Sequence, residues 1–183
     1  MLSTEPGAGH SPESIAKEIV NHLNDQGPLE NEFERYFFEK GKLKTTSVVS
    51  YGIRPLVKLH GADSLFEVWD NKKKAKLESE EDEAVLAEYI DFCVTQINVF
   101  LGAVKASLPP ERWTADKQKK GLLTTTNING FIVCLRRIIE NDRLYKFEYY
   151  QKRLAGLSNF DFKKYRSSQY GSMGDELYKQ HFS

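Results

Sequence analysis

The segment from residue 85 to residue 104 constrains the fold more than any other part of the chain. Its apolar residues recur at intervals of 3, 1, 3, 4, 3, 1 and 3, the spacing of one helix face: Leu86, Tyr89, Ile90, Cys93, Ile97, Phe100, Leu101 and Val104. Val85, Phe92 and Val99 widen the apolar arc beyond half of the helix. Such a helix must be covered on more than one side. The sequence therefore predicts a long central helix that ends near Pro109-Pro110.

Helical spacing or a capping residue predicts several further helices. Ser11, Pro12 and Glu13 are typical of a helix start, and the helix that they begin ends at Gly27-Pro28. Helices are also expected at residues 46–57, 63–69, 126–140, 144–154 and from residue 175. Pro55 lies inside the first of these and predicts a kink or a break.

Residues 31–47 give neither a clean helical nor a clean strand period. They contain strand-prone aromatic residues and a glycine that can form a turn, namely Phe33, Tyr36, Phe37, Phe38 and Gly41. The segment is therefore compatible with one short β-hairpin near residues 31–47. The predicted fold class is mainly α, an irregular helical bundle around a long central helix.

Composition divides the chain into a tail and one domain. Residues 1–10 are rich in Gly, Pro, Ser and Glu and are expected to be a mobile tail, whereas residues 11–183 form a single helical domain. Residues 71–81 carry a block of lysines and then a block of acidic residues, which predicts an exposed charged linker within that domain. Ser79, with Asp82 three residues later, resembles a capping box.

The charge balance and the cysteines limit the class of protein. The chain has 26 basic and 26 acidic residues, so a globally basic nucleic-acid binder is not indicated and any DNA contact needs a local patch. No run approaches the roughly 18 apolar residues that cross a bilayer. The first ten residues do not resemble a secretory signal. Cys93 and Cys134 lie in apolar helical patterns, as reduced core residues do. We expect a cytoplasmic protein without membrane contact.

The sequence contains no recognisable catalytic constellation. Four histidines are scattered without partners at metal-ligand spacing: His10, His22, His60 and His181. There is no Gly-rich phosphate loop and no Gly-x-Ser-x-Gly turn. The acidic residues 80–83 form a solvated run, which does not provide the contrasting environments of an acid–base pair. We therefore predict a protein that is not an enzyme and that uses no cofactor and no metal.

The first candidate site lies at residues 122–130, Leu-Leu-Thr-Thr-Thr-Asn-Ile-Asn-Gly. Hydroxyls, amides and free backbone N–H groups before a helix can hold an anion or phosphate, and the candidates are Thr124, Thr125, Thr126 and Asn127. A structural interpretation is simpler and is favoured. In it, Thr126 or a neighbour caps the helix and Gly130 allows close packing against another element.

The second candidate site is a basic and aromatic stretch near the carboxyl end. Its candidate nucleic-acid contacts are Lys152, Arg153, Lys163, Lys164 and Arg166, interleaved with Phe160, Phe162 and Tyr165. Basic residues alternating with aromatic residues suit nucleic-acid backbones and bases. They also suit an aromatic edge packed on the bundle with the lysines in solvent.

Three segments, taken in order, are similar to a known family: residues 14–24 followed by Gly27-Pro28-Leu29, residues 46–59, and residues 122–132. Their order resembles the carboxyl-terminal half of DGQHR-domain proteins, relatives of the DndB regulator that is found with DNA phosphorothioation genes. In that family a helix with the pattern A-x-x-I-V-x-x-L-N … P-L follows the diagnostic domain. The resemblance spans roughly Ser11 to the end. The Asp-Gly-Gln-His-Arg motif and the ParB-like region around it are absent from the sequence, so no functional residue carries over.

The resemblance implies a non-catalytic helical module, either a carboxyl-terminal fragment or a stand-alone version of the helical half. It is expected to bind DNA or a partner protein, such as the DGQHR-containing half, in a bacterial DNA-modification or phage-defence system. The alternative is a structural oligomerisation or scaffolding domain without nucleic-acid contact. A homo-oligomer is compatible with both.

Overall fold

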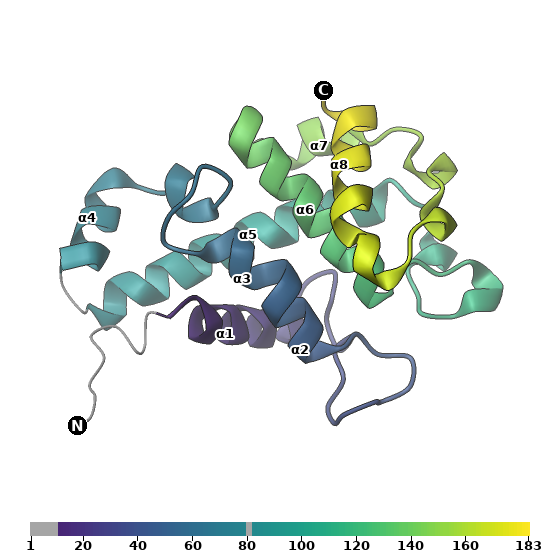
Figure 1. Ribbon diagram of the computed structural model, residues 1–183, viewed down its shortest axis with the longest axis horizontal. Coiled ribbons are helices and arrows are strands. Elements are labelled where there is room, and N and C mark those ends of the chain that lie inside the picture. The colour runs from purple at the N-terminus through teal and green to yellow at the C-terminus, as the bar shows by residue number, and fades with distance from the viewer. Residues whose placement is uncertain (1–10, 80–81) are drawn as a thin grey trace.

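The apolar stripe forms the long helix α5 (Glu83–Ala106), the central element of the computed structural model (Figure 1). The structure describes residues 11–79 and 82–183. Asp82 caps α5, because its carboxylate accepts hydrogen bonds from the backbone N–H groups of Ala84 and Val85 at 2.9 and 3.1 Å. Several other helices pack against α5, so the central helix is covered on more than one side, as predicted.

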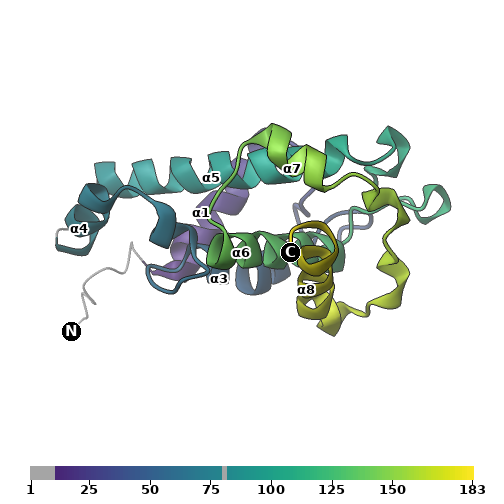
Figure 2. The same cartoon turned by 90° about the horizontal axis from the view of Figure 1, so that it is seen from above.

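The other main helices lie in two layers. α1 (Pro12–Asp25), α6 (Thr125–Asn141) and α7 (Phe147–Arg153) each contact α5, and α8 (Tyr170–His181) packs along α6. Figure 2 shows α5 and α7 side by side in one layer, with α6 and α8 in the other. The predicted mainly α fold, an irregular bundle around a long central helix, is confirmed.

Among the described helices, α5 is also the one that is long and apolar enough to cross a membrane by length and composition. A core helix meets the same two criteria. The buried residues of α5 belong to the main hydrophobic cluster of this structure. The helix therefore carries no argument for a membrane, and the expected lack of membrane contact stays a prediction.

Glycines bring α6 and α8 close together. A Cβ on Gly130 would lie 2.4 Å from Sδ of Met173, and a Cβ on Gly174 would lie 2.4 Å from Cβ of Val133. The contact at Gly174 also involves the Gly130 carbonyl oxygen at 2.7 Å and requires glycine, whereas a larger residue at position 130 would have to displace the Met173 side chain. Gly130 thus allows close packing against another element, as the structural interpretation of residues 122–130 predicted. α8 begins at Tyr170, earlier than residue 175, because glycines in its first turns weaken the sequence signal.

The chain between residues 45 and 57 forms three consecutive helical segments: α2 (Thr45–Ser47), the π-helical turn η2 (Val48–Ile53) and α3 (Arg54–Val57). Pro55 has no N–H to donate, and the hydrogen-bond register changes just before it. Arg54 N–H reaches the carbonyl of Val49, five residues back. The kink or break predicted at Pro55 is therefore a change of register inside a continuous helix.

The prediction of a β-hairpin near residues 31–47 was wrong. Among the described residues the β contacts are limited to one isolated bridge, between Phe33 and Leu43, and it is parallel. The Leu43 N–H donates to the Glu32 carbonyl at 2.8 Å, and its carbonyl accepts from the Glu34 N–H at 3.0 Å. A two-stranded hairpin is antiparallel, so the intervening chain instead loops round and returns in the same direction.

This returning chain, the aromatic loop (residues 34–42), exposes three consecutive aromatic side chains. Tyr36, Phe37 and Phe38 are 65%, 73% and 87% exposed. Phe38 has a φ of 65°, a left-handed conformation in which its N–H donates to Glu34 Oε2 at 3.1 Å. The aromatic run that suggested a strand therefore faces solvent instead of pairing.

The linker predicted at residues 71–81 is mostly a helix, α4 (Asn71–Ser79). Leu77 is its buried residue, and Lys74 Nζ donates to the Glu67 carbonyl at 2.7 Å. The described charged residues are exposed, as expected, except for the half-buried Lys74, but one apolar contact and good helix formers favour a helix over a loop. The capping-box prediction is wrong, since Asp82 itself caps α5. The predicted tail, residues 1–10, and residues 80–81 lie outside the described residues.

Cys93 and Cys134 are free thiols, and both are buried. Burial raises the pKa of both thiols well above the ordinary value, so the reactive thiolate is scarce. We expect the native protein to resist labelling by dithionitrobenzoate near pH 8 and both thiols to react after denaturation in guanidinium chloride. Fast labelling of the native protein would contradict this packing.

Candidate anion-binding site

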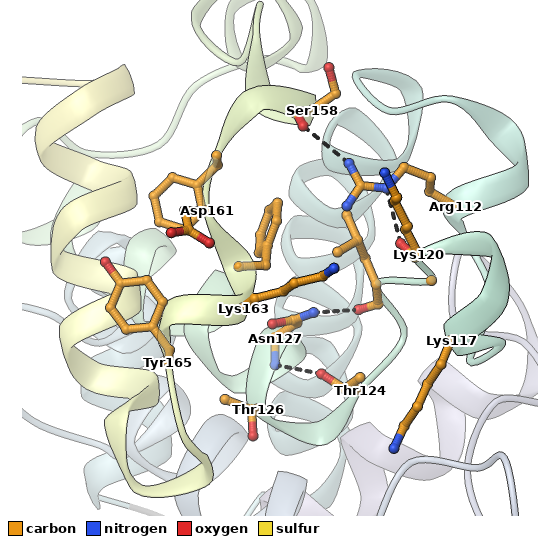
Figure 3. A pocket seen from close by; sticks show the side chains of 14 residues that line it. Arg112, Lys117, Lys120, Thr124, Thr126, Asn127, Ser158, Asp161, Lys163 and Tyr165 are labelled. Atoms are coloured by element: carbon orange, nitrogen blue, oxygen red, sulfur yellow. Dashed lines mark hydrogen bonds between the residues drawn. The ribbon is translucent and has the colours of Figure 1, made fainter.

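A cavity of about 790 Å³ lies between the amino terminus of α6, the loop of residues 110–121 and the segment of residues 158–165 (Figure 3). We call it the cationic pocket. Its lining includes four cationic side chains and one carboxylate, from Arg112, Lys117, Lys120, Lys163 and Asp161. Thr124, Thr126 and Asn127 line it from the start of α6.

The first turn of α6 presents unused backbone donors. Thr124 is the N-cap, and its Oγ1 accepts from the Asn127 N–H at 3.1 Å. Within the described residues, the N–H groups of Thr125 and Thr126 have no acceptor. These donors, together with the positive end of the dipole of this 17-residue helix, favour a negative group in the pocket.

Asn127 is 6% exposed and lines the pocket from the same turn. Its Nδ2 donates to the Leu122 carbonyl at 3.2 Å, which fixes the amide. Its Oδ1 accepts no hydrogen bond from a described residue. The amide therefore has its donor side engaged with the protein and its acceptor side available for a ligand donor.

The loop of residues 110–121 is held in place by side-chain hydrogen bonds to distant segments. The Arg112 guanidinium donates to the carbonyls of Lys120 and Ser158 at 3.0 and 3.1 Å, so it joins two walls of the pocket. Trp113 Nε1 donates to the Pro28 carbonyl at 2.8 Å. At Gly121 a Cβ would lie 2.0 Å from the Thr114 carbonyl oxygen, so this tight turn requires glycine.

The lysines of the pocket are available for a ligand. Lys117, Lys120 and Lys163 are exposed, and none of them makes an ion pair among the described residues. Figure 3 shows the Lys163 side chain crossing the pocket from its own segment, with Arg112 and Lys120 on the facing wall. Cationic side chains thus surround a helix amino terminus on two sides, with Asp161 as the one carboxylate of the lining.

The structure brings together part of each predicted site. Thr124, Thr126 and Asn127 line the cationic pocket, and Lys163 of the basic stretch lines it as well. Thr125 lies on the other side of the helix start, where its Oγ1 accepts from the Lys44 N–H at 3.0 Å. The two sequence candidates are therefore neighbours in space.

The other members of the basic stretch lie outside this lining. Arg153 is used structurally: its guanidinium donates to the Phe182 carbonyl at 3.0 Å and lies over the Tyr149 ring. Lys164 lies over the Tyr165 ring, 5.6 Å from its centroid. Lys152 and Arg166 are exposed. The stretch is therefore divided among several environments.

Sequence reasoning missed Arg112, Lys117 and Lys120. A signal for them exists, because the run Lys117-Gln118-Lys119-Lys120 ends shortly before the capping threonines. A basic run beside an unsatisfied helix start predicts anion binding more strongly than either feature alone.

No protein-family model, no curated protein and no solved structure matches this chain. The fold and the site define an all-α helical bundle with a cationic pocket at a helix amino terminus.

Proposed function

We propose that this chain is a non-catalytic helical module that binds DNA, with backbone phosphate lying in the cationic pocket. It acts in the bacterial cytoplasm, in a DNA-modification or phage-defence system, alone or with a DGQHR-containing partner. The resemblance of three segments to DGQHR-domain proteins supports the setting. The observation that carries the DNA assignment is that Arg112, Lys117, Lys120 and Lys163 line one cavity with the start of α6.

Phosphate is the anion that this arrangement suits. Backbone N–H groups at a helix start give directional hydrogen bonds, and lysines add charge that does not depend on one exact geometry. Binding to DNA releases counterions for each phosphate that is neutralised, so a few clustered lysines contribute even in a protein without net charge. The neutral overall composition then limits non-specific binding elsewhere on the surface.

The absence of turnover stays a part of the proposal, and the composition of the pocket lining is as follows. Asp161 is its single carboxylate, and it contains no histidine and no cysteine. Among the described residues no group of three or more His, Cys, Asp or Glu side chains is placed to hold a metal ion. Metal-assisted hydrolysis needs groups of these kinds, and general acid–base catalysis often uses them, although lysine and tyrosine can also transfer protons.

Fluorescence anisotropy with labelled DNA tests the proposal. We expect binding whose logarithmic affinity falls with the logarithm of salt concentration, with a slope of roughly −3 for three phosphate-binding lysines. The titration compares about 50 mM with about 200 mM salt, the range over which phosphate contacts weaken most visibly. An absence of DNA binding at both salt concentrations would contradict the proposal.

The alternative, a scaffolding domain without nucleic-acid contact, is favoured by one observation. The aromatic loop exposes three adjacent rings, of Tyr36, Phe37 and Phe38, and exposed aromatic clusters are typical of protein interfaces. Light scattering over a range of protein concentrations separates the two functions. Self-association without any response to DNA supports the scaffold, whereas salt-sensitive DNA binding by a monomer supports the main proposal.

A further inference from the structure

A second cavity of about 670 Å³ lies beside the cationic pocket, and both cavities include Thr126 in their lining. Hydroxyl side chains line it from three separate parts of the chain: Ser47, Thr125, Thr126, Ser167 and Ser168. We call it the hydroxyl pocket. Its volume lies within the range of about 300–1,000 Å³ that is typical of small-molecule sites. Its lining is polar and has a different composition from that of the cationic pocket.

Asn129 is the buried polar group of the hydroxyl pocket. It is 2% exposed, and its Oδ1 has no hydrogen-bond partner among the described residues. The amide lies against Gly52 of the π-helical turn, where a Cβ would lie 2.4 Å from Oδ1. Oδ1 is therefore covered by Gly52, whereas no described residue accepts from Nδ2, which is not fully buried and can donate into the cavity. A free amide N–H donor can contact an acceptor atom on the edge of a base.

Two tyrosines provide aromatic walls for the same cavity. Tyr51 is 54% exposed, and its ring centroid lies 6.1 Å from that of Tyr170, with 38° between the ring planes. Exposed tyrosine faces are surfaces on which unpaired bases stack. Lys44 also lines the cavity and adds a positive charge.

We propose that the hydroxyl pocket holds the base and sugar of a nucleotide whose phosphate lies at the start of α6. Asn129 recognises the base edge, Tyr51 or Tyr170 stacks on the base, and the hydroxyls contact the sugar. A base inside a duplex has its edge paired and its faces stacked, so this pocket selects an unpaired nucleotide. The inference rests on the proposed function for the position of the phosphate, and it narrows the ligand to single-stranded DNA or a free nucleotide, which share this chemistry.

Anisotropy with the full chain tests the inference. The probes are a labelled single strand of about 12 nucleotides, within the length that one binding domain covers, and the duplex of the same sequence. Unlabelled AMP, GMP, CMP and TMP are titrated separately by NMR. The variants are Asn129→Leu, which removes the amide at similar volume, and Tyr51→Ala, which changes an exposed ring and leaves the core intact.

Asn98→Leu is the matched control. Asn98 lies on α5, its Oδ1 is also buried without a partner, and it also packs against a glycine, Gly27, where a Cβ would lie 2.9 Å from Oδ1. It lines neither pocket. Any general effect of removing an amide whose Oδ1 is buried without a partner therefore appears in this variant as well.

We expect the parent chain to prefer the single strand, and Asn129→Leu and Tyr51→Ala each to lower single-strand affinity about tenfold. Duplex affinity and the Asn98→Leu variant should stay unchanged. Salt-sensitive binding to both DNAs that neither variant alters would overturn the inference and leave the proposed function standing. Binding of a mononucleotide but not of DNA, lost in Asn129→Leu, would support the inference with a free nucleotide as ligand and overturn the DNA proposal. Binding of none of the probes would overturn both.

Discussion

Replacing Lys117, Lys120 and Lys163 together by glutamine is expected to weaken DNA binding roughly 100-fold at about 150 mM salt, because each lost phosphate contact removes about 0.9 released counterions. The salt slope should become shallower by about 3 for the same reason. The lysine side chains are exposed, so the fold should not change. Anisotropy measures the affinity, and circular dichroism checks that the helices persist.

A second triple variant distinguishes the cationic pocket from the basic stretch. Lys152, Lys164 and Arg166 belong to that stretch but do not line the pocket. Replacing them by glutamine removes the same formal charge. We expect a loss of less than about fivefold, since these side chains do not line the pocket and exposed charges are partly screened by salt. Equal losses in both triple variants would mean that DNA follows the whole stretch instead of the pocket.

A third variant controls for net charge. Lys17, Lys72 and Lys146 are exposed and lie on α1, on α4 and before α7, and none of them lines the cationic pocket. Their replacement by glutamine should leave affinity and salt slope nearly unchanged. If this variant also lost most of its affinity, binding would depend on overall charge, and the pocket would have no special role.

The helices were predictable where the signal is local. The stripe that defines α5 and the similar one in α6 depend on residues three and four apart, so the sequence of each helix alone shows which of its faces is apolar. The same reasoning failed for residues 31–47, because an aromatic run does not show whether its side chains are buried in the core or exposed to solvent. Tyr36, Phe37 and Phe38 lie in a loop because Phe33 and Leu43 take the core positions beside them.

The candidate site was predictable only in part for a related reason. A helix start is predicted by the residue types at Thr124, Thr126 and Asn127, and this signal involves only a few neighbouring residues. The pocket itself depends on the Arg112 hydrogen bond to the Ser158 carbonyl, 46 residues away, and no local pattern encodes that contact. Arg153 illustrates the opposite error. From the sequence, Arg153 is predicted to be an exposed cation that is free to bind a ligand. In the structure its guanidinium donates a hydrogen bond to the Phe182 carbonyl.

Replacing Asp63 by asparagine is expected to lower the free energy of unfolding by about 3 kcal/mol, because breaking a buried ion pair leaves its partner charge without compensation. Asp63 Oδ2 accepts from Nε and Nη2 of Arg136 at 3.0 and 2.6 Å, and its Oδ1 lies 3.3 Å from Lys58 Nζ. The Asp63 and Arg136 side chains are 12% and 17% exposed. The pair joins the loop after α3 to α6. Urea denaturation followed by circular dichroism measures the change.

The neighbouring ion pair provides a matched control. Arg137, the next residue on α6, pairs with Asp175 at 2.7 Å, but that carboxylate is 58% exposed. Asp175→Asn should therefore cost less than about 1 kcal/mol, as exposed ion pairs do. Equal losses in the two variants would show that burial does not strengthen the Asp63 pair.

The pH dependence of the Asp63 variant has a defined sign. Burial raises the pKa of Asp63, but the hydrogen bonds and charges of Arg136 and Lys58 outweigh burial, so the pKa lies below the ordinary 3.8. A carboxylate with a lowered folded pKa stabilises the fold above its unfolded pKa, and this contribution disappears as the pH falls through the folded pKa. The difference in unfolding free energy between the parent and Asp63→Asn should thus be constant from neutral pH to about pH 5 and shrink below about pH 4. A difference that persists unchanged at lower pH would mean that the carboxylate charge is not what Asp63 contributes, and that the hydrogen-bond geometry at Arg136 accounts for the loss.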